Sequence, residues 1–198
     1  MQIITVANLK GGCGKTTITR NLAVAAGDKA AMVDLDPQGT LSDWLRARSA
    51  DYPTLISGIT PGNLQTAISD LSQDYDYLFI DSPPAAHSWI GEVMALSDLV
   101  LIPVKPSPDD LRAVGETLSM LDDTNFCFVV NQAIGRARIT NEAARVLAQH
   151  GKVAPATINY RVAFQESGGG YGVTEKGDKR SAQEITDLWE YVYKQLGK

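Results

Sequence analysis

The ten residues Asn8–Thr17 combine glycines, lysines and hydroxyl side chains at a spacing that suits phosphate chemistry. They read Asn-Leu-Lys-Gly-Gly-Cys-Gly-Lys-Thr-Thr and stand between an apolar run, residues 3–7, and a helix-like segment, residues 15–26. A glycine-rich turn between a strand and a helix presents backbone N–H groups to an anion. Lys15 would add a positive charge, and Thr16 would offer a hydroxyl to Mg²⁺. The stretch therefore predicts a nucleotide-binding phosphate loop rather than a plain tight turn.

Two positions of this loop are unusual. Leu9 stands where such loops usually have a glycine, five residues before Gly14, and Lys10 adds a second lysine at the start. Taken alone, Lys10 is most simply interpreted as a solvated loop lysine. The residues expected to contact the nucleotide here are Lys10, Gly11, Gly12, Cys13, Gly14, Lys15, Thr16 and Thr17.

Carboxylates close the next two apolar runs of the chain. Asp34 and Asp36 come at the end of residues 30–35, and Asp81 follows residues 77–80. Residues two apart on a strand point to the same side, so we expect Asp34 and Asp36 to face one site. Hydrolysis of a phosphoanhydride needs an in-line water, a metal and neutralised charge. One carboxylate of the pair would position water and the other, with Asp81, would organise Mg²⁺; the alternative is that Asp-Pro-Gln-Gly is simply a turn.

Two later strand ends carry groups suited to a nucleotide base. Residues 103–108 include three prolines, whose fixed φ makes the segment stiff. This segment, with Pro106, would form a wall for the base or contact a partner, with a rigid turn as the alternative. Asn131 follows the apolar residues 127–130. Its amide offers a donor and an acceptor to an adenine edge, with a loop turn as the alternative.

The elements that position these residues alternate between strand and helix. Strands are expected at residues 3–7, 30–35, 77–80, 99–104 and 127–130, with a weaker one near 153–158. Helices are expected at residues 15–26, 40–48, 63–73, 88–96, 109–121, 140–150 and 181–196. Most strand candidates are continuously apolar, as in strands covered on both faces. This order predicts an α/β three-layer sandwich, a mostly parallel twisted sheet with ligands at the carboxyl ends of its strands.

Composition fits one domain of 198 residues in a reducing compartment. The two cysteines lie far apart and show no metal-ligand spacing. The chain opens into its first strand, so no signal peptide is expected, and no apolar run approaches the length of a membrane span. Charge is uneven: residues 1–130 hold 8 Lys/Arg and 16 Asp/Glu, whereas residues 131–198 hold 10 and 7. The basic end suits a polyanion, with an uneven solvated surface as the alternative.

Together these motifs resemble the deviant phosphate-loop ATPases of the ParA/MinD group. The resemblance covers nearly the whole chain and rests on residues 10–17, 33–38, 79–84 and 130–131; the Asp-Pro-Gln signature, the prolines and residues 185–189 look like the ParA branch. It implies a P-loop ATPase that uses ATP and Mg²⁺. It also implies that Lys10 reaches the partner's phosphates in an ATP-sandwich homodimer. Asp36 would orient the catalytic water, and Asp81 would organise Mg²⁺.

The resemblance further implies a weak, partner-stimulated ATPase that acts in the cytoplasm on the nucleoid. The ATP-bound dimer would bind DNA non-specifically and position a plasmid or chromosome, or alternatively a protein organelle such as a carboxysome or a receptor cluster. A ParB-like or adaptor protein would stimulate hydrolysis. No helix-turn-helix region precedes the first strand, so a single ATPase domain over residues 1–198 is expected. Candidate DNA contacts are Arg136, Arg138, Arg161, Lys176, Lys179 and Arg180.

A membrane-associated ATPase of the MinD kind is the main rival. The last helix candidate has an apolar stripe at helical spacing, formed by Ile185, Leu188, Trp189, Val192 and Leu196. Its polar side carries Glu184, Asp187 and Glu190, which anionic lipid would repel, so a packing helix and no membrane contact are expected. A metal–sulfur carrier would need a Cys-x-x-Cys pair, which Cys13 and Cys127 do not form. A small-molecule kinase would not explain Lys10 together with Asp-Pro-Gln.

Overall fold

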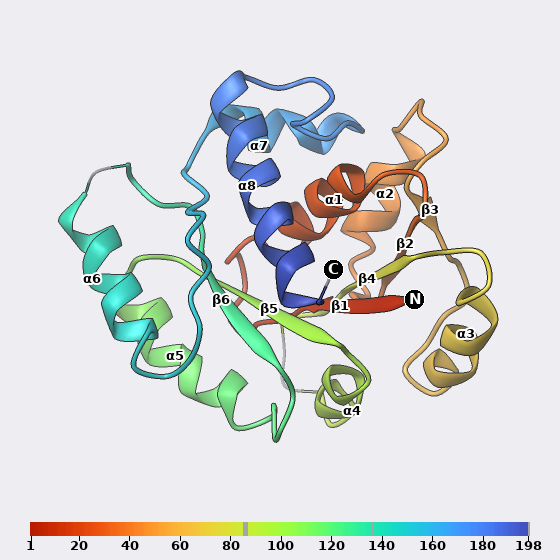
Figure 1. Cartoon of the computed structure of the whole chain (residues 1–198), viewed down its shortest axis with the longest axis horizontal. Helices are drawn as coiled ribbons and strands as arrows, with labels where there is room; N and C mark the ends of the chain where they lie inside the picture. The colour runs from red at the N-terminus through yellow and green to blue at the C-terminus, as the bar shows by residue number, and fades with distance from the viewer. Residues whose placement is uncertain (85–86, 136, 198) are drawn as a thin grey trace.

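The computed structural model describes residues 1–84, 87–135 and 137–197, and a six-stranded sheet forms its centre (Figure 1). All paired strands are parallel, in the order β3-β2-β4-β1-β5-β6. The strands are β1 (Gln2–Val6), β2 (Ala30–Asp34), β3 (Thr54–Leu55), β4 (Tyr77–Asp81), β5 (Leu99–Val104) and β6 (Phe126–Val130). The helices are α1 (Lys15–Ala26), α2 (Thr40–Arg46), α3 (Leu64–Leu71), α4 (Ile90–Ala95), α5 (Pro108–Leu118), α6 (Arg138–Leu147), α7 (Val162–Glu166), the 3-10 helix η1 (Ser167–Gly169) and α8 (Lys179–Gln195).

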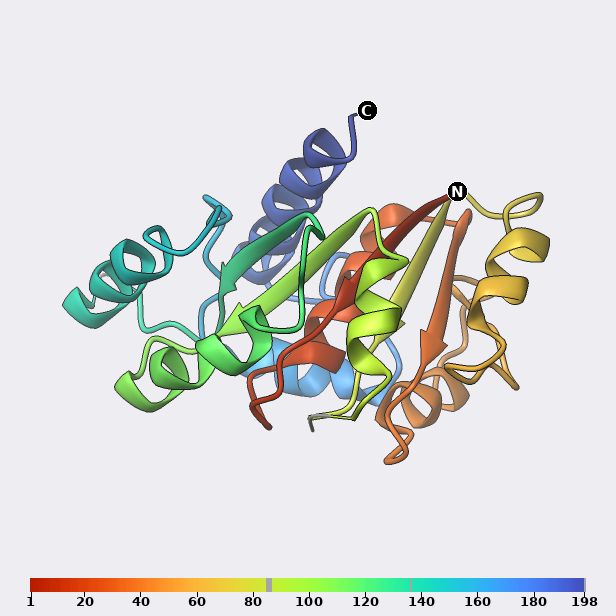
Figure 2. The same ribbon diagram turned by 90° about the horizontal axis from the view of Figure 1, so that it is seen from below.

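Helices cover both faces of this sheet, which confirms the predicted α/β sandwich. One face packs against α1, α2, α7 and α8 through a cluster that includes Ile18, Phe79 and Leu188. On the other face, α4, α5 and α6 share a cluster with β5 and β6, while α3 covers the side near β2 and β4. Figures 1 and 2 show α1 and α8 on one side of the sheet and α4 and α5 on the other. Apolar burial from both sides explains the continuous apolar runs of the strands.

The last helix is held by its apolar stripe. Ile185, Leu188 and Val192 of α8 are fully buried in the cluster shared with α1. This packing matches the expected role of the stripe. Among the described residues, no helix has the length and apolar character needed to cross a bilayer.

Strand register brings the chemically interesting residues to one edge. β1 lies between β4 and β5, with Val6 opposite Asp81 on one side and opposite Leu101 on the other. In turn, Asp34 at the end of β2 is opposite Asp81. Since all these strands are parallel, the loops that follow them share the carboxyl edge of the sheet.

Two predictions about elements were wrong. The weak strand near residues 153–158 does not form; Val153 and Asn159 instead make isolated parallel bridges to Phe128 and Ala133. Pro155 lies in the middle of this run and has no N–H to donate to a ladder. The second strand ends at Asp34 rather than at residue 35, so Asp36 lies beyond it. The short β3 and α7 were not predicted, because elements of two and five residues show no usable periodicity.

Candidate nucleotide-binding site

The loop between β1 and α1 is shaped around Gly14. This residue caps α1 at φ 95°, in the left-handed region that favours glycine. A Cβ atom at this position would lie only 2.2 Å from the amide nitrogen of Asn131. That nitrogen donates a 2.6 Å hydrogen bond to the Cys13 carbonyl, and Gln132 Nε2 donates to the Gly12 carbonyl at 2.9 Å. The end of β6 therefore clamps the loop, and only glycine fits beneath the clamp.

Lys15 is buried within the loop although it carries a charge. Its ammonium donates to the Asn8 carbonyl at 3.0 Å and to the Lys10 carbonyl at 3.5 Å, and the residue is 6% exposed. Among the described residues, no carboxylate lies within salt-bridge distance of this ammonium. Lys10 is exposed at the loop rim, with its backbone N–H bonded to Asn8 Oδ1 at 2.8 Å. The loop thus offers positive charge to an anion.

Asp81 is a fully buried carboxylate beside this loop. Thr16 Oγ1 donates to its Oδ2 at 2.6 Å, and Thr19 Oγ1 donates to its Oδ1 at 3.2 Å. Burial, aided by the negative charge of Asp34, raises the pKa of Asp81 to about 7, against the opposing influence of the threonine hydroxyls and Lys15. Among the described residues Asp81 makes no salt bridge, so burial outweighs the more distant charge of Lys15.

The donor set at this edge fits Mg²⁺. Oxygens of Thr16, Asp81 and Asp34 are hard ligands, and a divalent cation would offset the burial of Asp81. Within the described ranges, no group of three or more His, Cys, Asp or Glu side chains is arranged to hold a metal ion. A magnesium ion would therefore depend on nucleotide phosphates and water for its remaining ligands, as is usual for this ion.

We predicted that Asp34 and Asp36 would lie on one strand and face the same side. This prediction was wrong, because only Asp34 belongs to β2. Asp34 accepts hydrogen bonds from the N–H of Asp36 at 3.1 Å and from the N–H and hydroxyl of Ser42, both at 2.9 Å. Asp36 lies in a turn, where its Oδ1 accepts from the Gln38 N–H and its carbonyl accepts from the Gly39 N–H. Asp-Pro-Gln-Gly is thus a turn, as the alternative interpretation predicted, and the role of Asp36 in orienting water stays a prediction. Asp36 is half-buried, so solvent reaches part of it.

A cavity of about 180 Å³ opens directly beyond the phosphate loop. Its lining includes Thr17, Arg20, Asn131, Gln132, Tyr160 and Phe164. Its position after the loop suits the ribose and base of a nucleotide whose phosphates occupy the loop. Pro106, also expected near the base, is buried; its role as a base wall stays a prediction. Gln132 and Tyr160 were missed, although Gln132 directly follows the predicted Asn131.

Arg20 joins α1 to the segment that carries α7. Its Nη2 donates to the Phe164 carbonyl at 2.8 Å and to Ser167 Oγ at 3.0 Å. The residue is 6% exposed, and within the described structure its Nε finds no hydrogen-bond partner. Burial lowers the pKa of Arg20 to about 10. The sequence did not indicate this role, because an arginine on a helix is normally solvated.

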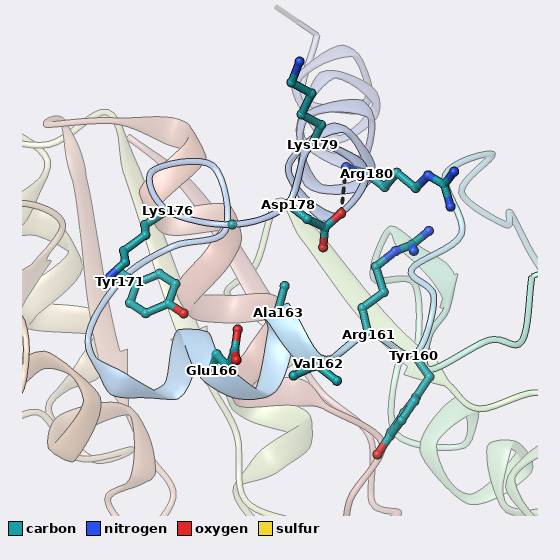
Figure 3. Close-up of a pocket in the computed structure, with 11 residues that line it drawn as sticks. Tyr160, Arg161, Val162, Ala163, Glu166, Tyr171, Lys176, Asp178, Lys179 and Arg180 are labelled. Atoms are coloured by element: carbon teal, nitrogen blue, oxygen red, sulfur yellow. Dashed lines mark hydrogen bonds between the residues drawn. The ribbon is translucent and has the colours of Figure 1, made fainter.

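Four of the predicted DNA contacts line one recess of about 880 Å³ beside α7 and α8 (Figure 3). They are Arg161, Lys176, Lys179 and Arg180. Lys179 and Arg180 are exposed in the first turn of α8, after the N-cap residue Asp178. In Figure 3, Arg161 and Arg180 extend to the same side of the recess. Arg161 is engaged by Glu184, which accepts from its Nη2 at 2.6 Å and from its Nε at 3.0 Å.

A fifth candidate, Arg138, is not among the residues that line this recess. Arg138 begins α6 and pairs with Glu142 at 2.6 Å, on a largely solvent-exposed surface. Arg136 lies outside the described residues. The five described basic residues that the sequence proposed thus do not all lie in one group. Lys176 also makes a cation–π contact, because its ammonium lies 5.3 Å from the centre of the Tyr171 ring.

Comparison with known proteins adds independent information. Residues 4–170 match the family described as "CobQ/CobB/MinD/ParA nucleotide binding domain". The chain is 33% identical over 181 residues to the maintenance of carboxysome distribution protein A of Halothiobacillus neapolitanus, covering 83% of this chain and 82% of that protein. It is 28% identical over 161 residues to the sporulation initiation inhibitor protein Soj of Bacillus subtilis, covering 60% and 64%.

A solved structure has the same fold. Apo McdA from Cyanothece superposes with a TM-score of 0.81 over 97% of this chain and 99% of that one, at 19% identity. At this identity the likeness concerns the fold alone. Three observations agree: the family match over most of the chain, the relative at 33% identity and the architecture of the phosphate loop. This chain therefore belongs to the CobQ/CobB/MinD/ParA nucleotide-binding family, in its ParA/MinD group of phosphate-loop ATPases.

Proposed function

We propose that this chain is an ATP-dependent, dimerising ATPase that binds DNA without sequence preference and positions a cargo on the nucleoid. The observation that carries the proposal is the assembly of Lys15, Thr16 and Asp81 at one strand edge, with the exposed Lys10 at its rim. A phosphate site with charged groups on the inside and an exposed lysine on the outside suits a nucleotide that is shared between two copies of the chain.

In this mechanism the loop binds the phosphates and the carboxylates organise the reaction. Loop N–H groups and Lys15 hold the polyphosphate, while Thr16, Asp81 and Asp34 would hold Mg²⁺. The metal would neutralise charge on the phosphates. Asp36, in its half-buried turn, would orient the attacking water. Lys10 would reach the phosphates of the partner copy, so that only the dimer has a complete site.

The basic recess would bind DNA through its phosphates. Lys176, Lys179 and Arg180 are exposed there and make no salt bridge among the described residues, although Lys176 contacts the Tyr171 ring. Arg161, by contrast, is held by Glu184. Contacts of this type release counterions and read no sequence. ATP would favour the dimer, the dimer would bind the nucleoid, and a ParB-like or adaptor partner would stimulate slow hydrolysis and release.

The relatives bear on the cargo. The Halothiobacillus relative is named for carboxysome distribution, and its match covers most of both chains. This supports a carboxysome-like organelle as the cargo ahead of the plasmid or chromosome that the sequence motifs placed first. A further relative, the chromosome-partitioning ATPase Soj of Thermus thermophilus, is 29% identical over 154 residues and supports chromosome partition as the second candidate.

A light-scattering experiment tests the switch. We expect wild-type protein with ATP and Mg²⁺ to shift from monomer to dimer, and Asp36→Ala to accumulate as dimer because it cannot turn ATP over. Lys10→Ala should bind ATP but stay monomeric, since it lacks the group that reaches the partner. A dimer fraction that does not depend on ATP, or normal turnover by Asp36→Ala, would contradict the proposal.

A further inference from the structure

A third lysine lies at the phosphate loop, and it comes from a different strand. Lys105 follows β5, and a Cβ atom on Gly12 would lie 3.6 Å from its ammonium nitrogen. Gly12 has a φ of 71° and is exposed in the loop. The Lys105 ammonium therefore faces the loop backbone between Lys10 and Lys15, although 95 residues separate it from Lys10 along the chain.

The backbone around Lys105 is fixed. Pro103 precedes it by two residues, and the Pro103 carbonyl accepts a 2.8 Å hydrogen bond from Asn8 Nδ2, which ties this segment to the start of the loop. Pro106 follows directly, and the Lys105 carbonyl accepts from the Ser107 N–H at 2.8 Å. Because two prolines restrict the backbone, the lysine stem starts from a defined position. Lys105 is half-buried at this fixed position, so its side chain has less conformational entropy left to lose when a ligand binds.

No acidic partner in the described structure accounts for this placement. Two carboxylates lie nearby along the chain. Asp109 pairs with Arg112, and Asp110 Oδ2 accepts from the Ser107 hydroxyl at 2.5 Å, while Asp110 Oδ1 is buried and has no hydrogen-bond partner among the described residues, Lys105 included. Within the described ranges, Lys105 makes no salt bridge. Lys15 inside the loop and Lys105 against Gly12 place two ammonium groups on one loop, and like charges repel each other unless an anion lies between them.

We infer that Lys105 is a third cation of the phosphate site and contacts the outer phosphates of the bound nucleotide. This inference rests on the proposed function, because it requires a polyphosphate in the loop. Lys15 lies inside the loop and Lys105 lies against its outer backbone at Gly12. The contribution of Lys105 therefore grows with the number of phosphates: large for ATP, smaller for ADP and negligible for AMP. Lys105 would make the loop selective for triphosphates within a single copy of the chain.

Isothermal titration calorimetry with Mg²⁺ and with ATP, ADP and AMP tests this inference. We expect Lys105→Ala to weaken ATP binding about 10-fold, as for loss of a charge-assisted hydrogen bond, and to change AMP binding less than about twofold. Lys105→Arg should restore most of the ATP affinity. Lys29→Ala is the matched control, since Lys29 is an exposed lysine that precedes β2 at the opposite edge of the sheet.

The outcomes separate the inference from the function beneath it. If Lys105→Ala binds ATP as wild type does, the inference fails while the proposed function stands. Equal weakening of ATP and AMP would show that Lys105 only supports the fold of the loop, which also overturns the inference. If wild type and Lys29→Ala fail to bind ATP at all, the proposed function fails first.

Discussion

The phosphate loop and the basic recess both gather positive charge, but they are built in opposite ways. In the loop, Lys15 is 6% exposed and Asp81 is fully buried, and hydrogen bonds from three strand ends fix the surrounding backbone. In the recess, Lys179 and Arg180 are exposed on the first turn of α8. A buried, pre-organised site suits one ligand in one geometry. An exposed set of long side chains suits a polyanion that can bind in many registers.

This difference predicts how strongly each region responds to substitution. Groups that are buried and hydrogen-bonded have large effects, because their removal leaves other groups without partners. Exposed charges act through solvent and are screened by salt, so each contributes about 1 kcal/mol or less.

The largest expected effect is at Lys15. Lys15→Ala removes the buried ammonium that the loop carbonyls position, so ATP affinity should fall about 100- to 1000-fold, which corresponds to about 3–4 kcal/mol. Calorimetric titration with ATP and Mg²⁺ measures this, with Lys29→Ala as the control. If Lys15→Ala bound ATP as tightly as wild type, the loop would not be the nucleotide site. The proposed difference between a buried phosphate site and an exposed basic recess would then be wrong.

An intermediate effect is expected from the titration of Asp81 in nucleotide-free protein. Its pKa is raised to about 7 by burial, so the folded state holds a proton that the unfolded state releases near pH 4. Stability is therefore fullest below about pH 4 for this group, and the free energy of unfolding falls as pH rises from about 4 to about 7, with a slope of at most about 1.4 kcal/mol per pH unit.

Urea unfolding at a series of pH values measures this slope. Asp81→Asn is the matched variant, because it keeps the shape of the side chain and cannot titrate. We expect this variant to lack the decline between about pH 4 and about pH 7. The same decline in both proteins would mean that another group causes it, and the loop would then be less tightly buried than the contacts of Asp81 indicate.

The smallest effect is expected in the recess. Lys179→Glu combined with Arg180→Glu should weaken DNA binding roughly 10-fold at low salt and should reduce the salt dependence by about 0.9 per lost phosphate contact. Dimerisation with ATP should not change. The variant should fold, since acidic residues in the first turn of a helix are favourable.

A fluorescence anisotropy assay with duplex DNA of arbitrary sequence measures this loss. Arg138→Glu is the comparison variant, because Arg138 is highly exposed, pairs with Glu142 and lies outside the recess. If Arg138→Glu weakens DNA binding as much as the double variant does, the DNA surface extends over α6. The recess would then be only part of it.

The sequence predicted the sheet and the loop because their signals are local. Continuous apolar runs identified five strands, and the glycine-rich stretch identified the loop that follows β1. What it missed depends on distant partners. Arg20 looks like a surface residue until Phe164 and Ser167 fold over it, and Asp36 leaves the strand because Asp34 accepts hydrogen bonds from the next turn. The basic candidates could not be sorted, since only the fold shows that Glu184 lies beside Arg161.

Helix α1 begins inside the phosphate loop, and a little more than one turn later its Arg20 holds the carbonyl of Phe164, next to the recess residue Ala163. Helix α1 thus connects the phosphate loop to the segment beside the basic recess. If nucleotide binding moves this helix and thereby changes the affinity for DNA, thermodynamics requires that DNA binding change the affinity for nucleotide by the same factor. A nucleoid surface would then be a regulator of how long ATP stays bound, and not only the track along which a cargo is placed.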